Sequence, residues 1–180
     1  MKKILNIILL AAFVLLIFFL LKSFVIGFYN VRSNSMSPEL ISGDRIIVNK
    51  MIYNFGGNIN IGDVIIFKSN KPENINIIKR IAALPLDTVL FDAKNIFVNG
   101  RAVRYNDYKN IHQIGDDILM EEIILNENEV FVIGDNFSNS IDSREFGVVD
   151  ISNILGRAIV IYYSKENGKS KSSRIGEIIK

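Results

Sequence analysis

The sequence predicts a mostly β domain, folded as a barrel or a sandwich and attached to a single N-terminal transmembrane helix. Three observations predict this class: a long apolar run near the start, short β-branched blocks after it, and no sustained 3.6-residue periodicity beyond residue 30. With 180 residues, the chain has room for one ordinary domain besides that apolar run.

The apolar run extends from Ile4 to Leu21, and seventeen of its eighteen residues are apolar, with Asn6 as the exception. A helix of that length reaches roughly 27 Å, close to the hydrocarbon thickness of a bilayer. A cleavable signal peptide has a shorter core of about 7–15 residues and small residues after it. Here the charged Lys22 follows instead, so we predict a membrane anchor within residues 1–29.

The charges beside the run bear on its orientation. Lys2 and Lys3 favour a cytoplasmic N-terminus, while Lys22 and Arg32 on the other side weaken that bias. We predict that the N-terminus is cytoplasmic and that the following domain lies on the outer side of the membrane.

Seven short segments rich in Val, Ile and Phe are predicted strands. They cover residues 45–50, 63–68, 75–81, 88–91, 95–98, 129–133 and 157–163. Turn residues separate them, such as the pair Asn99-Gly100, which tolerates the positive φ angles of a tight hairpin. We place the β-rich domain at residues 30–164, with a polar insertion near 105–126. Residues 165–180, with five basic and two acidic side chains, are expected to form a solvated, mobile tail.

Composition excludes several kinds of chemistry. The chain has no cysteine, so it has no disulfides and no thiolate nucleophile, and a lone His112 cannot build a usual zinc site. We therefore expect no metal and no cofactor. Its 21 basic and 19 acidic residues nearly balance, which does not fit binding to nucleic acid through phosphate neutralisation.

Three serines crowd the segment that follows the predicted anchor. Ser33, Ser35 and Ser37 lie within residues 31–40, where Pro38 favours an extended conformation at its neighbour. By pattern alone, a polar turn between the anchor and the first strand fits this segment better than a nucleophile does.

A lysine in the predicted strand 75–81 is a candidate general base. Strand alternation places Lys79 between Ile77 and Ile81 on one face. Burial among such side chains lowers the pKa of a lysine, and a neutral amine can take a proton from a serine hydroxyl. A lysine that buries its stem and extends its ammonium group to water fits the same pattern.

A run of small polar residues follows the predicted strand 129–133. Within it, Asp142 and Arg144 can pair to fix the backbone, and a serine hydroxyl could orient a lysine amine. A loop that serves only its own turns fits equally well.

Together these segments resemble the ordered sequence boxes of the type I signal peptidases. The boxes, after the apolar run, are Ser35-Met-Ser-Pro-Glu-Leu40, Gly43-Asp-Arg-Ile-Ile-Val-Asn-Lys50, Gly62-Asp-Val-Ile-Ile-Phe67, Lys79-Arg80 with Pro85 and Asp87, and Gly134-Asp-Asn136 followed by Ser140-Ile-Asp-Ser-Arg144 and Gly147. The resemblance implies a membrane-anchored serine endopeptidase that removes signal peptides on the outer side of the bacterial plasma membrane. Its implied partners are signal-peptide-bearing preproteins and membrane lipid, with no nucleic acid.

The resemblance also implies roles for individual residues. Ser35 matches the family's nucleophile and Lys79 its general base. Ser33 matches the position whose hydroxyl joins the Ser35 backbone N–H in the oxyanion hole.

Three further residues match supporting positions of the family. Ser140 matches the serine that orients the lysine, and Asp142 with Arg144 matches a supporting pair.

The chain departs from the family pattern at four positions. Ala83 and Leu86 stand where glycines are common, Phe137 replaces a frequent arginine, and Phe146 stands where tryptophan is common. These departures bear on turn geometry and substrate preference, so a specialised peptidase with a narrow substrate set is an alternative. A catalytically inactive, membrane-tethered β module and a hydrolase that uses His112 are two further alternatives.

Overall fold

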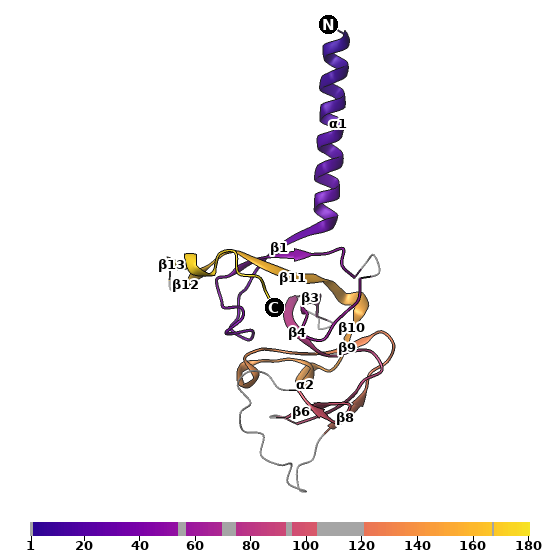
Figure 1. The fold of residues 1–180 in the computed structure, drawn as a ribbon, viewed down its shortest axis with the longest axis vertical. Coiled ribbons are helices and arrows are strands. Elements are labelled where there is room, and N and C mark those ends of the chain that lie inside the picture. The colour runs from indigo at the N-terminus through magenta and orange to yellow at the C-terminus, as the bar shows by residue number, and fades with distance from the viewer. Residues whose placement is uncertain (1, 54–56, 70–74, 93–94, 104–120, 167) are drawn as a thin grey trace.

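The computed structural model describes the chain except for residues 1, 54–56, 70–74, 93–94, 104–120 and 167. The chain begins with helix α1 (Lys2–Val25), which projects from a β-rich body (Figure 1). The described large apolar side chains of α1, from Ile4 to Phe19, are exposed. Among the residues that the structure describes, no helix combines the length and the hydropathy expected of a membrane span.

A seven-stranded antiparallel sheet forms most of the body. In spatial order its strands are β1 (Ile26–Asn30), β2 (Arg45–Asn49), β11 (Ile154–Tyr163), β3 (Val64–Lys68), β4 (Asn76–Ala83), β9 (Glu129–Ile133) and β10 (Val149–Asp150). The long strand β11 lies between β2 and β3, so it brings the chain from after the candidate site back into the middle of the sheet.

A smaller four-stranded sheet and several short elements complete the body. The small sheet has the order β7 (Arg101–Ala102), β6 (Ile96–Val98), β5 (Thr88–Phe91) and β8 (Glu121–Ile124), and β12 (Lys165–Glu166) pairs with β13 (Lys169–Ser170). The short helices are η1 (Phe137–Asn139), α2 (Ser143–Phe146), η2 (Ile151–Asn153) and η3 (Ser172–Arg174). Asn99 and Gly100 both have positive φ, 50° and 74°, at the turn between β6 and β7, as the hairpin prediction requires.

The core consists of three clusters of buried apolar side chains. One joins the two sheets: Ala83 and Phe131 from the large sheet pack with Val89 and Ile96 from the small one. Another lies beneath the loop between β1 and β2 and contains Met36 and Leu40. The prediction of a mostly β fold is confirmed, and all seven predicted strands are present.

The predicted segment boundaries need three corrections. The helix ends at Val25, and residues 26–30 form β1, because their pairing with β2 satisfies their backbone hydrogen bonds within the sheet. In the predicted insertion near 105–126, residues 121–124 form β8, which pairs with β5, while residues 105–120 lie outside the described part of the chain.

The tail is the third correction, because residues 168–180 fold back onto the domain, although most of their side chains are exposed. Val160 of β11 forms a bridge with Ile178, and Arg174 pairs with Asp44 at 2.9 Å. The Asp44 side chain is fully buried, so its carboxylate needs a cationic partner, which the tail supplies.

Candidate active site

The loop between β1 and β2, residues 31–44, carries the predicted nucleophile. Two backbone hydrogen bonds close its neck: Val31 N–H donates to the Asp44 carbonyl at 2.8 Å, and Gly43 N–H donates to the Val31 carbonyl at 3.0 Å. Met36, immediately after Ser35, is buried in the core beneath the loop. Ser35 is half-buried, and its Oγ lies 3.2 Å from Oγ of Ser33. The predicted nucleophile and the predicted oxyanion hydroxyl are therefore neighbours.

Asn136 fastens this loop to the segment after β9. Its backbone N–H donates to the Ser35 carbonyl at 2.9 Å, and its Nδ2 donates to the Asn34 carbonyl at 3.1 Å. Asn136 belongs to the Gly-Asp-Asn box, but the pattern alone assigns it no role. Its function depends on a contact between residues 102 positions apart, which no local pattern reveals.

Lys79 is buried in β4, where it pairs in register with Ile65 of β3. Its side-chain neighbours on the strand follow the predicted alternation, since Ile77 and Ile81 belong to one core cluster and Ile78 to another. Its Nζ donates a hydrogen bond to Ser140 Oγ at 2.8 Å. The alternative in which Lys79 extends its ammonium group to water does not apply, because Lys79 is only 3% exposed.

The surroundings of Lys79 favour its neutral form. Desolvation is the main cause and lowers the pKa of Lys79 from 10.5 to about 8. The negative charge of Asp142 opposes this shift, while the positive charge of Arg144 adds to it. About a tenth of the amine is therefore unprotonated at pH 7 and about half at pH 8.

Asp142 and Arg144 form a buried pair behind Ser140. The Asp142 carboxylate accepts from Arg144 Nε at 2.8 Å, from Arg144 Nη2 at 2.9 Å and from the Gly134 backbone N–H at 3.0 Å. Burial raises the pKa of Asp142, but the hydrogen bonds from Arg144, Gly134 and Ser140 outweigh it and hold that pKa below its ordinary value. Lys79, Ser140, Asp142 and Arg144 thus form one continuous polar chain.

Gly134 marks the point where these segments converge. A Cβ atom on this residue would lie 2.1 Å from Ser140 Oγ and 2.5 Å from the Ser35 carbonyl oxygen. Only the absence of a side chain lets the nucleophile loop and the Ser140 segment approach so closely. The structure therefore places the six predicted residues, from three separate segments, around Gly134. Lys79 Nζ is hydrogen-bonded to Ser140 and Ser35 Oγ to Ser33, and no hydrogen bond joins Lys79 directly to Ser35.

A second buried ion pair adjoins the site and was not predicted. Arg80, next to Lys79, donates through Nε to Asp135 Oδ1 at 2.9 Å and through Nη2 to Oδ2 at 2.7 Å, and its Nη1 donates to the Gly62 carbonyl at 2.6 Å. The available signal was a charged residue within an otherwise apolar strand, since such a residue needs a buried partner. The pair joins β4 to the residue just before Asn136.

Three of the departures from the family pattern have a visible structural setting. Leu86 has a positive φ of 69°, a conformation that glycine adopts at lower cost. Phe137 packs against the Arg144 guanidinium, with 3.5 Å between Cζ and the ring centroid, and Phe146 packs against Phe67. Nothing in the structure explains the choice of Ala83 beyond its burial.

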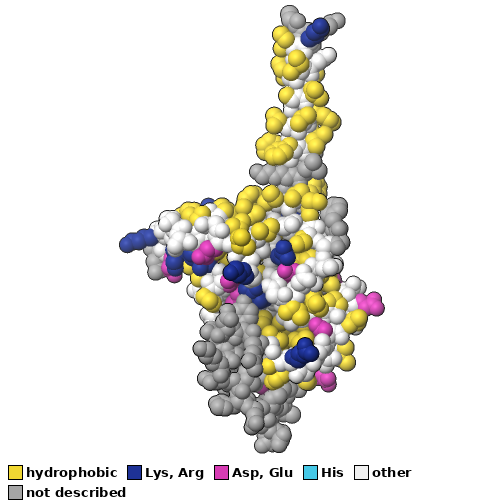
Figure 2. All heavy atoms as spheres, viewed as in Figure 1, with side chains coloured by type: hydrophobic (Ala, Val, Ile, Leu, Met, Phe, Trp, Pro, Cys, Tyr) yellow, Lys and Arg dark blue, Asp and Glu magenta, His cyan; other side chains and the backbone are white. Residues whose placement is uncertain are grey.

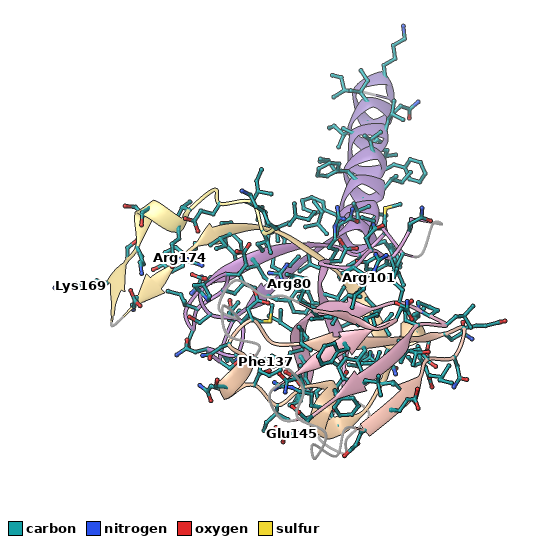
Figure 3. The ribbon with its side chains drawn as sticks, turned by 60° about the horizontal axis from the view of Figure 1, so that its bottom comes forward. Arg80, Arg101, Phe137, Glu145, Lys169 and Arg174 are labelled. Carbon is teal, nitrogen blue, oxygen red and sulfur yellow. The ribbon has the colours of Figure 1, made fainter. Side chains whose placement is uncertain are left out.

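A cavity of about 430 Å³ opens beside Ser140, between the small sheet and the short helices η1 and α2. Its lining combines the rings of Phe91 and Phe137 with the carboxylates of Asp92, Glu121 and Glu145. Figure 3 shows Phe137 and Glu145 on this side of the body. Within the described part of the chain, no group of three His, Asp or Glu side chains is arranged to hold a metal ion.

Replacing Asp142 with asparagine is expected to destabilise the protein by about 3–5 kcal/mol at pH 7, because it leaves the buried Arg144 without its counter-charge. Urea unfolding measures this difference. Since the folded-state pKa of Asp142 lies below its unfolded value, its stabilisation is present above pH 4 and is lost as the pH falls through the folded-state pKa. The difference in the free energy of unfolding between wild type and Asp142→Asn should therefore become smaller in acid.

The Asp150→Asn variant is the matched control, since Asp150 caps a short helix as Asp142 does but is only partly buried. If the two variants lose the same amount of unfolding free energy, the structural importance of the buried Asp142–Arg144 pair is contradicted.

Comparisons with known proteins identify the family of the chain. Residues 4–163 match the family model described as signal peptidase, peptidase S26. The chain is 35% identical over 153 residues to signal peptidase I of Bacillus caldolyticus, covering 79% of this chain and 82% of that protein. It is 31% identical over 170 residues to signal peptidase IB of Staphylococcus aureus (strain COL), covering 87% of each.

A crystal structure of a signal peptidase I from Enterococcus faecalis V583 is also similar, with 27% sequence identity and a TM-score of 0.42. The match covers 56% of this chain and 96% of that one. Because the family model covers most of the chain and two relatives exceed 30% identity over most of their length, the chain belongs to the peptidase S26 family of signal peptidases.

Proposed function

We propose that this protein is a membrane-bound serine endopeptidase that removes N-terminal signal peptides from exported preproteins, with Ser35 as nucleophile and Lys79 as general base. The observation that carries the proposal is the buried amine of Lys79. It is bonded to Ser140, which meets the Ser35 loop across Gly134. A desolvated lysine at such a position serves as a base where the chain offers no cysteine and a single histidine.

The reaction begins with transfer of the Ser35 hydroxyl proton to the neutral amine of Lys79. The Ser35 oxygen attacks the scissile carbonyl carbon, and the Ser33 hydroxyl and the Ser35 N–H stabilise the resulting oxyanion. Loss of one such donor typically costs about 10²–10³ in turnover. The ammonium of Lys79 then protonates the leaving amine as the peptide bond breaks, which leaves an ester on Ser35.

Hydrolysis of that ester completes the cycle. Lys79 takes a proton from a water molecule, the water oxygen attacks the ester carbonyl, and Ser35 leaves with the proton returned by Lys79. Ser140 directs the amine throughout, and the Asp142–Arg144 pair holds Ser140 in place. The family resemblance implies a substrate bound as an extended strand with small side chains near the cleaved bond.

The membrane location is part of the same proposal. Apolar side chains cover the visible surface of α1, and more gather where it meets the body (Figure 2). At that junction Phe24 and Phe28 are 74% and 56% exposed, and Phe28 packs edge-on against Tyr162. We propose that α1 lies in the plasma membrane with a cytoplasmic N-terminus and that the β domain lies on the outer side, next to membrane lipid. A substrate anchored in the same bilayer then meets the site at a raised effective concentration.

Cleavage of a preprotein by membranes that carry the wild type or single variants tests the proposed function. Ser35→Ala is expected to abolish processing, because it removes the oxygen that attacks the scissile carbonyl carbon. His112→Ala is expected to leave processing near normal; His112 lies outside the described residues. An active Ser35→Ala variant would refute the dyad, and an inactive His112→Ala variant would favour a histidine-dependent hydrolase.

A panel of preproteins distinguishes general from narrow specificity. Processing of several unrelated preproteins would support the general function, and processing of a single one would support the specialised alternative. An inactive wild type would favour the membrane-tethered β module.

A further inference from the structure

The loop that carries Ser35 is fastened from two directions. Asn136 holds its first limb at Asn34 and Ser35, as described above. Its second limb, residues 39–44, is held by residues 174–180, which we call the strap. These residues play no part in the mechanism proposed above.

Arg174 is the strap's first attachment. Its Nη2 donates to the Glu39 carbonyl at 2.6 Å and to Asp44 Oδ2 at 2.9 Å, and its Nε donates to Asp44 Oδ1 at 3.4 Å. The Asp44 side chain is fully buried and that of Arg174 is 13% exposed. One guanidinium therefore bonds two points of the loop, a backbone carbonyl and the carboxylate near the loop's neck.

Lys180 is the second attachment. It is hydrogen-bonded to Glu39 in the loop that carries Ser35 and to Arg80, the neighbour of Lys79. Its backbone N–H donates to Glu39 Oε1 at 2.8 Å, four residues after Ser35. Its carbonyl accepts from Arg80 Nη1, and Arg80 follows Lys79 in β4. The chain end lies beside β3 and β4 in Figure 1, and Figure 3 labels Arg174 in the tail and Arg80 in the body of the domain.

The strap is itself seated on the outer half of β11. Gly176 N–H donates to the Ile161 carbonyl at 2.8 Å, Ile161 N–H donates to the Glu177 carbonyl at 3.0 Å, and Ile179 N–H donates to the Ile159 carbonyl at 2.9 Å. Ile179 also packs against the core cluster that contains Met36 and Leu40. The strap thus has a fixed position from which it can hold the loop.

We propose that residues 174–180 set the position of Ser35 relative to Lys79, with Arg174 and Glu39 as positioning residues. The proposal rests on the proposed function above. Attack requires the Ser35 oxygen within hydrogen-bond reach of the amine, and a misplacement of about 1 Å can cost roughly 10² in rate. The second limb has other contacts as well, since Lys165 N–H donates to the Gly43 carbonyl at 3.3 Å and Leu40 is buried in the core. Release of the strap therefore loosens this limb at Glu39 and Asp44 without unfolding the loop, and it leaves the dyad chemically intact.

Variants of the two attachments test the proposal. Glu39→Ala removes the bond to Lys180, and Glu39→Gln retains an acceptor oxygen. Arg174→Met removes both of Arg174's attachments, while Arg174→Met combined with Asp44→Asn also removes the uncompensated buried charge. Lys171→Ala is the matched control, because Lys171 lies in the same tail and pairs with the exposed Glu166 without contact to the loop.

The readouts are kcat, KM, thermal unfolding and amide hydrogen exchange of residues 33–40 in the full-length protein. We expect Arg174→Met to lower kcat by about tenfold or more with KM within about twofold. We expect Glu39→Ala to lower kcat by a smaller factor and Glu39→Gln to have a kcat near that of the wild type. Exchange of residues 33–40 should rise in both attachment variants and not in Lys171→Ala. The double variant should recover stability but not kcat.

Two results would overturn the proposal. One is a kcat that recovers together with stability in the double variant. The other is loop exchange that matches the Lys171→Ala control in both attachment variants. The exchange measurement does not depend on activity, so it still decides whether the strap holds the loop if the wild type fails to process preproteins.

Discussion

Replacing Lys79 with methionine is expected to abolish cleavage and, at the same time, to raise the free energy of unfolding at neutral pH. The two effects have one cause. The site keeps an amine in a dry environment, which lowers its pKa from 10.5 to about 8 and makes it a usable base. The same desolvation disfavours the folded state whenever the amine carries its proton.

The pH dependence gives the sign of the stability effect. Between pH 8 and 10.5 the unfolded chain binds more protons than the folded one, so stability rises with pH across that range. Below about pH 8 the full penalty applies, and a shift of this size corresponds to up to about 3 kcal/mol. Methionine has a similar length and no charge, so Lys79→Met removes the penalty.

Urea unfolding at pH 7 and at pH 11 measures this effect, with Lys171→Met as an exposed control. The advantage of Lys79→Met should be largest at pH 7 and should shrink in alkali. A variant that is less stable than the wild type at pH 7, or that still cleaves a preprotein, would contradict the role assigned to the buried amine.

Gly134→Ala is expected to reduce kcat by about 10² or more. The new methyl group would overlap Ser140 Oγ at 2.1 Å and the Ser35 carbonyl oxygen at 2.5 Å. Ser140 could change its rotamer, but the backbone carbonyl can yield only if the nucleophile loop moves. Either response separates groups that must meet for proton transfer.

Gly100→Ala is the matched control for this substitution. Gly100 has a positive φ of 74° and open space around it, so alanine there introduces backbone strain far from the dyad. Its thermal stability should fall while its kcat stays near the wild-type value. Wild-type kcat in Gly134→Ala would show that the loop and the Ser140 segment need not approach as closely as the structure has them.

The predicted strands and the hairpin turn could be identified because their signals lie within a few consecutive residues. Alternating apolar residues identified the seven long strands, and the positive φ angles at Asn99 and Gly100 follow from residue types that tolerate them. The two-residue strands were missed because so few residues establish no alternation. β1 and β8 were missed because their residues were assigned to the anchor and to the polar insertion. The prediction that the tail is free of the domain was wrong, because its charge gave no sign that Arg174 pairs with a carboxylate 130 positions away.

The residues of the site also fall into two groups, those that the sequence identified and those defined only by contacts between distant segments. Lys79 and Ser35 were named from the sequence because five boxes occur in the family's order after the apolar run. The isoleucine neighbours of Lys79 did not by themselves distinguish a buried amine from one that reaches water. The roles of Asn136, Asp135 and Arg80 depend on pairings across 55 to 102 positions. Such pairings emerge only when the antiparallel order β3, β4, β9 places the ends of these strands together.

The dependence of kcat/KM on pH is the most direct test of the central claim, that an unprotonated Lys79 amine accepts the proton of Ser35. The rate should be low in acid and should rise with an apparent pKa near 8, the value that burial sets for Lys79. A rate that stays flat from neutral pH down to pH 4 would show that the reaction does not require the neutral amine, and would contradict the account.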